Sequence, residues 1–267
     1  MLSTALTLLA LLPSAPVSVQ AHPLSLLPKV ATPKDLALID AQYHNSGLDL
    51  DGNAGFGIPL RSRALLSLVY PSSIGLVENG KTYPVDSFTY EPEVYITPSE
   101  ETAWLFNDSA TYTVFFADAS SLGDPDVRGN YLHFLGNGYH GSTSSRGKKS
   151  LTFKPHGGKV ISEYFAPGPL PGTGPHRYSY LYFAEPHSFR PPANLSEPDT
   201  PSAPIYVADY VRQTGVKLLA ASWFTTEPNG EPTGPVAVTQ TVNPATLVVP
   251  APTGKHGGKG EDDQKKW

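Results

Sequence analysis

The sequence predicts an all-β fold, and three features of the chain support this prediction. The 267 residues include 28 Pro and 24 Gly, which divide the chain into short segments. Aromatic and β-branched residues, which favour strands, are concentrated in those segments. Tyr178, Tyr180 and Tyr182 also alternate with the residues between them, and this period of two is typical of a strand.

Residues 1–21 have the pattern of a secretory signal peptide. An apolar run from Leu2 to Leu12 is followed by small residues and Pro, and Val19-Gln20-Ala21 fits the small-x-small rule before a cleavage site. The apolar run is too short to span a bilayer. We therefore expect a secreted, extracellular protein. Because the chain contains no Cys, its stability is expected to come from a hydrophobic core and not from disulfides.

The remaining sequence divides into three regions. Residues 22–59 are expected to form an N-terminal extension with a short helix at 34–42, residues 60–227 a β domain, and residues 228–267 a Pro/Gly-rich, disordered tail. Asn79-Gly80 predicts a two-residue hairpin between segments 76–78 and 81–83. A helix is expected at 205–214, where Pro204 suits the first turn and Gly215 can end it. Residues 136–149 are expected to form a Gly/Ser-rich loop, and strands are expected at 64–70, 93–97, 112–117, 130–135, 150–154, 176–183 and 216–224.

The charge of the chain argues against nucleic acid as its main partner. The formal net charge is −5, and charged residues make up 16% of the sequence without a basic stripe. Two N-glycosylation sequons are present, at Asn107 and Asn194, and both lie in segments that resemble loops.

One carboxylate and two imidazoles are the candidate ligand-binding side chains. Asp118 follows a buried strand, His133 lies on a strand, and His176 follows a Gly/Pro-rich loop at residues 166–175. A carboxylate can fix the tautomer of an imidazole and raise its pKa, and a protonated imidazole suits a phosphate or carboxylate ligand. The structural alternatives are a strand-end turn for Asp118, a core histidine for His133 and an ordinary proline-rich turn for the loop.

Other chemistries have less support in the sequence. The same three residues could bind a metal, but no short histidine spacing such as H-E-x-x-H is present, so no metal site is predicted. The chain also lacks a G-x-S-x-G motif, a Cys nucleophile and a Walker-type phosphate loop. We therefore predict neither an enzyme nor a bound cofactor.

Residues 168–178, Gly-Pro-Leu-Pro-Gly-Thr-Gly-Pro-His-Arg-Tyr, resemble the G-P-P-x-G-x-G-x-H-R-Y signature of the phosphatidylethanolamine-binding protein family, with Leu170 in place of the second Pro. Residues 130–135 are similar to the family's W-x-H-[FW] strand, with Tyr131 in the Trp position, and residues 205–224 are similar to its late helix and the strand that follows. The family's D-P-D-A-P motif is reduced to Asp118, because residues 118–122 lack the prolines and the second Asp. Among family members, the chain resembles the fungal carboxypeptidase Y inhibitors.

The resemblance implies a large antiparallel β-sandwich with a few short peripheral helices and a small anion pocket. By position, Asp118, His133, His176 and Tyr178 would line this pocket, with Tyr131, Gly168 and Pro169 at its wall. The family is not catalytic, and its members bind phosphorylated head groups or inhibit other proteins. The implied partner is therefore a phosphorylated small molecule or a phospholipid head group.

Two other functions remain open from the sequence. The chain could be a secreted inhibitor of a serine protease or carboxypeptidase, acting through a protein surface that the pocket only partly defines. A more remote alternative is a secreted β-sandwich hydrolase that uses two carboxylates, which requires a defined separation between them. The Gly/Pro loop followed by His-Arg favours the binding protein over the hydrolase.

Overall fold

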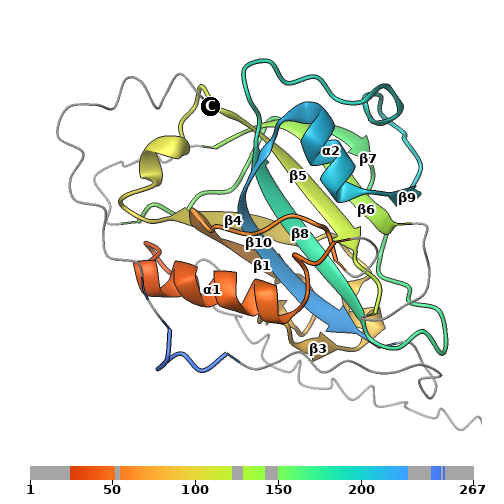
Figure 1. The fold of residues 1–267 in the computed structure, drawn as a ribbon, viewed down its shortest axis with the longest axis horizontal. Helices are drawn as coiled ribbons and strands as arrows, with labels where there is room; N and C mark the ends of the chain where they lie inside the picture. The colour runs from red at the N-terminus through yellow and green to blue at the C-terminus, as the bar shows by residue number, and fades with distance from the viewer. Residues whose placement is uncertain are drawn as a thin grey trace, which may run out of the picture.

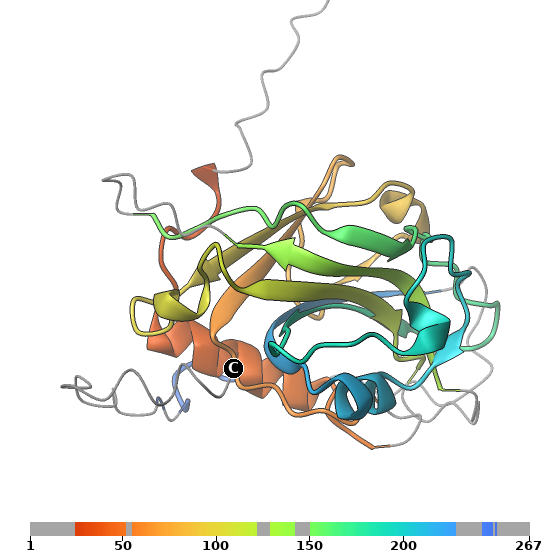
Figure 2. The ribbon, with the colours of Figure 1, turned by 90° about the horizontal axis from the view of Figure 1, so that it is seen from above.

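The structure is a computed structural model that describes residues 25–51, 55–121, 129–141, 150–227, 242–247 and 249. Two β-sheets lie face to face, and two α-helices lie on the outer side of the larger sheet (Figures 1 and 2). This arrangement confirms the predicted strand-rich fold. The described elements are, in chain order, α1 (Pro33–Asn45), β1 (Ala64–Tyr70), β2 (Gly75–Leu76), β3 (Thr82–Tyr83), η2 (Val85–Phe88), β4 (Glu93–Pro98), η3 (Ala103–Leu105), β5 (Thr111–Asp118), β6 (Asn130–His140), β7 (Lys159–Ser162), β8 (His176–Ala184), η4 (Ala193–Leu195), β9 (Pro204–Ile205), α2 (Val207–Thr214) and β10 (Lys217–Thr226).

The register of the larger sheet brings three strand ends together. The smaller sheet has the order β2-β1-β4, and the larger sheet has the order β3-β10-β8-β5-β6-β7, with β9 paired to β6. Among the described strand pairs, only β3 and β10 are parallel. Asp118, the last residue of β5, lies opposite Tyr131 of β6 and opposite Tyr178 of β8. Side chains from these three strands can therefore meet at one end of the sheet.

Both faces of the larger sheet are buried. Tyr178, Tyr180 and Tyr182 of β8 point into a hydrophobic cluster between the two sheets. Leu181 and Phe183 point into a second cluster, which includes residues of α1 and α2 and the segment between α1 and β1. This confirms the predicted alternation in β8, and it explains why the strand is apolar on both faces.

Local sequence signals define the ends of the two α-helices. Thr32 caps α1, where its hydroxyl accepts from the Asp35 amide at 3.2 Å and its own amide donates to the Asp35 carboxylate at 2.9 Å. Gly215 ends α2 in the left-handed conformation, with φ of 73°, and its amide donates to Val211 O. The expected helix at 34–42 therefore lies within α1, and the predicted stop of the second helix is confirmed.

The predicted hairpin at Asn79-Gly80 is wrong in its pairing. A turn does form, with the Lys81 amide donating to Glu78 O at 3.2 Å. The flanking segments nevertheless join different sheets, because β2 pairs with β1 and β3 pairs with β10. The Asn79 side chain accepts hydrogen bonds from Ser222 Oγ at 2.7 Å and from the Trp223 amide at 3.1 Å, which attaches the turn to β10.

Three other expectations require correction. Residues 150–154 do not form a strand, and only Phe153 makes an isolated bridge, to Ile96 of β4. The second helix begins at Val207, because Pro204 belongs to β9, where it pairs with Tyr131. Residues 136–140, expected in a loop, continue β6, and Gly138 adopts φ of 69° within it.

Several expectations concern residues that the structure does not describe. The signal peptide at 1–21 and most of the tail at 228–267 lie outside the described residues, so the predicted domain boundaries stay predictions. The helices of the described part are all too short or too polar to cross a bilayer.

Candidate functional site

A cavity of about 330 Å³ lies where β5, β6 and β8 meet. It contains six of the seven predicted ligand-binding residues, Pro169 being the one that does not line it. The sequence therefore named half of the twelve lining residues, and their role in ligand binding stays a prediction. The lining residues are Asp118, Ser120, Gly129, Tyr131, His133, Phe165, Gly168, Leu170, Thr173, His176, Tyr178 and Pro204.

A chain of hydrogen bonds runs through the cavity and orients His176. The Ser120 amide donates to Asp118 Oδ1 at 2.6 Å, and Asp118 Oδ2 lies 2.7 Å from His176 Nδ1. On the other side of the ring, His176 Nε2 lies 2.7 Å from Thr173 Oγ1, which also donates to Leu170 O at 2.7 Å. Because the carboxylate can only accept from Nδ1–H, Asp118 fixes the tautomer of His176, as predicted.

His133 is held in a different way. Its Nδ1 lies 2.8 Å from Phe165 O, and since a carbonyl oxygen only accepts, Nδ1 carries the proton. Burial lowers the pKa of His133 from its ordinary value of 6.5, and this effect exceeds the opposite effects of the Phe165 hydrogen bond and of the Asp118 charge. His133 is therefore a neutral ring at pH 7, with Nε2 as a hydrogen-bond acceptor.

Tyr178 lies between the two imidazoles. Its ring centroid is 5.2 Å from that of His133 and 6.2 Å from that of His176. Burial raises the pKa of Tyr178, and the negative charge of Asp118 raises it further. The phenol therefore stays protonated and keeps a hydroxyl that can donate to a ligand.

Arg177 lies outside the cavity lining, although it follows His176 directly in sequence. Its guanidinium donates to four backbone carbonyl oxygens, those of Ser46, Gly47, Ala119 and Ser120, at 2.8 to 3.1 Å. Burial lowers its pKa to about 10, so it is still charged at pH 7. Arg177 thus fastens the segment after Asp118 to the segment after α1, and no lysine or arginine occurs among the described residues that line the cavity.

The sequence missed several residues of the site. Thr173 lies between Gly172 and Gly174, whose φ angles of 84° and 79° shape the loop, and this glycine spacing was the only available signal. Phe165 and Leu170 form an apolar rim with Tyr131, and their exposed fractions are 53%, 65% and 38%. Phe165 and Leu170 lie in loops, where no repeating sequence pattern indicates which side chains face a cavity, whereas Tyr131 lies in β6 and was predicted.

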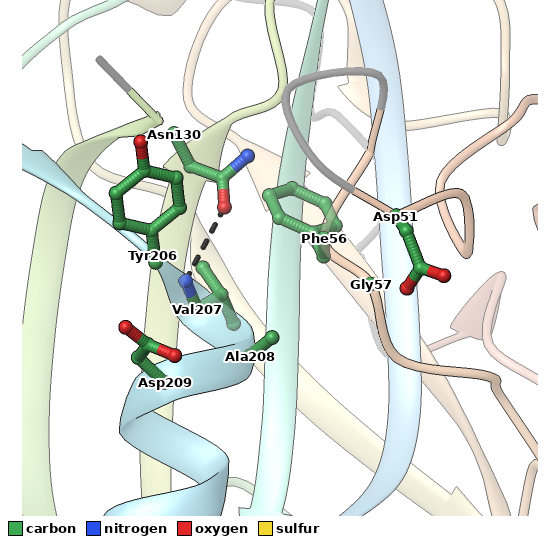
Figure 3. A pocket seen from close by; sticks show the side chains of 8 residues that line it. All are labelled: Asp51, Phe56, Gly57, Asn130, Tyr206, Val207, Ala208 and Asp209. Carbon is green, nitrogen blue, oxygen red and sulfur yellow. Dashed lines mark hydrogen bonds between the residues drawn. The ribbon is translucent and has the colours of Figure 1, made fainter. Parts of the chain in front are cut away.

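A second cavity, of about 340 Å³, lies beside the N-terminus of α2 (Figure 3). Both polar atoms of the Asn130 side chain are hydrogen-bonded there, with Oδ1 accepting from the Val207 amide at 3.3 Å and Nδ2 donating to Gly55 O at 2.9 Å. The Asp209 carboxylate pairs with Arg212 at 2.9 Å. These polar groups therefore support the fold and give no indication of a ligand. The lining residues are Asp51, Phe56, Gly57, Asn130, Tyr206, Val207, Ala208 and Asp209.

The predicted modification sites have an exposed setting. Asn107 and Asn194 are both exposed. The side-chain oxygen Oδ1 of Asn107 accepts from the amide of Ser109 at 3.0 Å and from the Ser109 hydroxyl at 2.6 Å. Glycosylation at both positions stays a prediction. For metals, the described residues contain no group of three or more His, Cys, Asp or Glu side chains that could hold an ion.

The fold and the site define a class of protein, a β-sandwich with a small polar pocket at the ends of its central strands. The chain belongs to the phosphatidylethanolamine-binding protein family, since the model of that family matches residues 76–222. This confirms the family resemblance of the sequence.

The individual proteins that the chain resembles are identical to it at only about a fifth of the aligned residues. The chain is 21% identical over 168 residues to the carboxypeptidase Y inhibitor of Saccharomyces cerevisiae, which covers 56% of this chain and 74% of the inhibitor. The structure of a carboxypeptidase Y inhibitor complexed with its cognate proteinase is similar in fold, with a TM-score of 0.54, 20% identity, and coverage of 71% of this chain and 94% of the other. A phosphatidylethanolamine-binding protein from Plasmodium falciparum matches with a TM-score of 0.44, 17% identity, and coverage of 70% and 96%. The matched family is named for binding, and the curated relative is named for inhibition of a carboxypeptidase.

Proposed function

We propose that this protein is a secreted binding protein whose pocket holds a small phosphorylated ligand, such as inorganic phosphate or a phospholipid head group. The observation that supports this proposal is the pairing of His176 with Asp118 at 2.7 Å in a cavity that His133 and Tyr178 also line. Two imidazoles and a phenol supply donors for phosphate oxygens once the rings are protonated.

The charges around the pocket predict a preference for acidic conditions. The described lining contains Asp118 but no lysine or arginine, so the positive charge must come from the imidazoles. Since burial lowers the pKa of His133, that ring gains a proton only below its ordinary value of 6.5. A phosphate monoester also gains a proton near pH 6, and its P–OH group could then donate to Asp118 or to neutral His133. Both effects make binding tighter as the pH falls.

Calorimetric titration of the mature protein with inorganic phosphate and with phosphoethanolamine tests the proposal, at pH of about 5, 6 and 8 to bracket the histidine range. Binding should strengthen toward low pH and disappear in His176→Ala. His187→Ala is the matched control, because His187 is exposed and does not line the pocket. Absence of binding at millimolar ligand at every pH would refute the pocket function. Vesicles with and without phosphatidylethanolamine then separate a lipid source of the head group from a free one.

Secretion is a second part of the proposal. Residues 1–21 have the features of a signal peptide, and both sequons lie at exposed positions. Expression of the full chain in a eukaryotic secretory host should give a product in the medium that begins at His22 and loses mass on enzymatic removal of N-glycans. Retention of residues 1–21 in an intracellular product would contradict it.

A second candidate function is inhibition of a secreted serine carboxypeptidase or protease. The similarity to a carboxypeptidase Y inhibitor, also in a structure with its cognate proteinase, favours this candidate. Inhibition assays against carboxypeptidase Y with the wild type and with the double variant His133→Ala/His176→Ala test it. Inhibition that survives in the double variant would assign it to a surface outside the pocket, and no inhibition by the wild type would eliminate this candidate for that enzyme.

A further inference from the structure

Both nitrogen atoms of the His176 imidazole are already bonded within the protein. Nδ1 lies 2.7 Å from Asp118 Oδ2, and Nε2 lies 2.7 Å from Thr173 Oγ1. Under the proposed function, Nε2 is the His176 atom that a ligand oxygen would contact, since Nδ1 is held by the carboxylate. A ligand can therefore reach Nε2 only if the Thr173 hydroxyl gives up this position.

The Thr173 side chain can make this exchange without moving its backbone. The Ser121 hydroxyl lies within hydrogen-bond distance of the backbone carbonyls of Thr173 and Pro175, and the Thr173 amide donates to Leu170 O at 3.2 Å. These contacts fix the loop. Rotation about χ1, which has discrete staggered positions, is then sufficient to move Oγ1 away from the imidazole.

The Thr173 hydroxyl also suits either protonation state of His176. The hydroxyl has one proton, which can be directed to Leu170 O or to Nε2, both at 2.7 Å. When the proton points to Leu170 O, Oγ1 accepts from Nε2–H, and when it points to the ring, Nε2 accepts. Thr173 thus competes most directly with an anion when Nε2 carries a proton, which is the state that an anion requires.

We propose that Thr173 is a side-chain latch that competes with the ligand for His176 Nε2 and thereby limits the affinity of the pocket for phosphate. This inference rests on the proposed function, and it concerns a residue that the family signature leaves variable. Thr173→Val removes the hydroxyl and so frees His176 Nε2. The shape of the side chain changes little, because valine and threonine have nearly the same volume.

The test compares Thr173→Val and Thr173→Ser with the wild type by calorimetry with inorganic phosphate at pH of about 5.5, below the ordinary histidine pKa. Thr173→Val should bind phosphate roughly tenfold more tightly, which is the equivalent of one hydrogen bond to a charged group. Thr173→Ser keeps the hydroxyl and should bind as the wild type does. Equal or weaker binding by Thr173→Val, with wild-type binding intact, would overturn the latch and leave the proposed function standing.

A measurement on the ligand-free protein tests directly whether the Thr173 hydroxyl is hydrogen-bonded to His176 Nε2. In ¹⁵N spectra of the imidazole rings, Thr173→Val should shift the Nε2 resonance of His176 and leave its Nδ1 resonance in place, while Thr173→Ser should shift neither. An unchanged Nε2 resonance in Thr173→Val would show that the hydroxyl does not occupy Nε2 and would overturn the proposal. If neither the wild type nor Thr173→Val binds phosphate, the proposed function and the latch fail together.

Discussion

His176 and Arg177 are neighbours in β8, yet they bind the same short segment through opposite faces of the strand. His176 Nδ1 pairs with Asp118 Oδ2 at 2.7 Å, and Arg177 donates to Ala119 O at 2.8 Å and to Ser120 O at 3.1 Å. Successive side chains of a strand point to opposite sides. The segment 118–120 is therefore held by an imidazole on the face of β8 that lines the pocket and by a guanidinium on the face that is covered by the segment after α1.

Replacing Arg177 should destabilise the fold even though this residue does not line the pocket. Arg177→Lys provides one ammonium group in place of the planar guanidinium, so several of the four carbonyl oxygens that Arg177 binds would lose their donor. We expect the free energy of unfolding to fall by about 2–4 kcal/mol, measured by urea denaturation. Arg190→Lys is the control at an exposed position, where the guanidinium donates to the Phe189 carbonyl oxygen. A change below about 0.5 kcal/mol, typical of surface substitutions, would contradict this role.

Replacing Asp118 should affect binding more than stability. In the wild type the Ser120 amide donates to Asp118 Oδ1 at 2.6 Å. Asp118→Asn keeps an acceptor for this amide but removes the negative charge beside His176. We expect phosphate affinity at pH of about 6 to fall at least tenfold, because a neutral amide does not stabilise positive charge on the His176 ring as the carboxylate does. Asp86→Asn, at an exposed carboxylate, should bind as the wild type does. Equal affinity in Asp118→Asn would mean that the carboxylate does not support the ligand-binding form of His176.

His133 should make the stability of the ligand-free protein depend on pH. Burial lowers its pKa in the folded protein below 6.5, whereas the unfolded chain has the ordinary value. Between these two pKa values the unfolded chain binds more protons, so the free energy of unfolding should fall as the pH decreases below about 6.5. His133→Asn keeps a donor for Phe165 O but does not titrate. The free energy of unfolding of this variant, relative to that of the wild type, should therefore rise as the pH is lowered from about 7.5 to about 5. A constant difference between the two proteins across this range would refute the prediction.

Tyr43 offers a pair of substitutions with opposite effects. Its ring packs edge-on against Trp223 at 5.7 Å, and its buried hydroxyl has no hydrogen-bond partner among the described residues. Tyr43→Ala should lower the free energy of unfolding by about 3 kcal/mol through the lost packing. Tyr43→Phe removes only the unpaired hydroxyl and should be neutral or slightly stabilising. Thermal unfolding followed by tryptophan fluorescence compares the two, and a large loss in Tyr43→Phe would reveal a polar partner of the hydroxyl.

The sequence predicted those parts of the fold whose signals are local. The alternation in β8, the stop at Gly215 and the strand at 64–70 depend on neighbouring residues, and the structure confirms them. The pairing of β2 and β3 with different sheets depends on contacts far apart in the chain, such as that of Asn79 with Trp223. Local turn chemistry cannot reveal such a partner. The strand expected at 150–154 was wrong for a related reason, since a short segment does not specify whether a neighbouring strand is available to pair with it.

In the candidate site, too, local sequence signals identified some residues, and residues whose role depends on contacts in the folded chain were missed. The family signature identified His176 and Tyr178, and the spacing between motifs identified Asp118 despite the loss of the flanking prolines. Sequence reasoning could not identify Thr173, because its importance depends on one distance, 2.7 Å to His176 Nε2. Nor could it show that Arg177 faces away from the pocket and leaves the described lining without a lysine or arginine.

The turn at Asn79 has a consequence for how the two sheets come apart. The Val77 amide donates to Leu68 O of β1 at 2.9 Å, and two residues later the Asn79 side chain accepts from the Trp223 amide of β10 at 3.1 Å. In a chain without Cys, this stretch is a short hydrogen-bonded bridge between the layers. The sheets should therefore separate in one cooperative opening, and the amide protons of Val77 and Trp223 should exchange with solvent at matching rates.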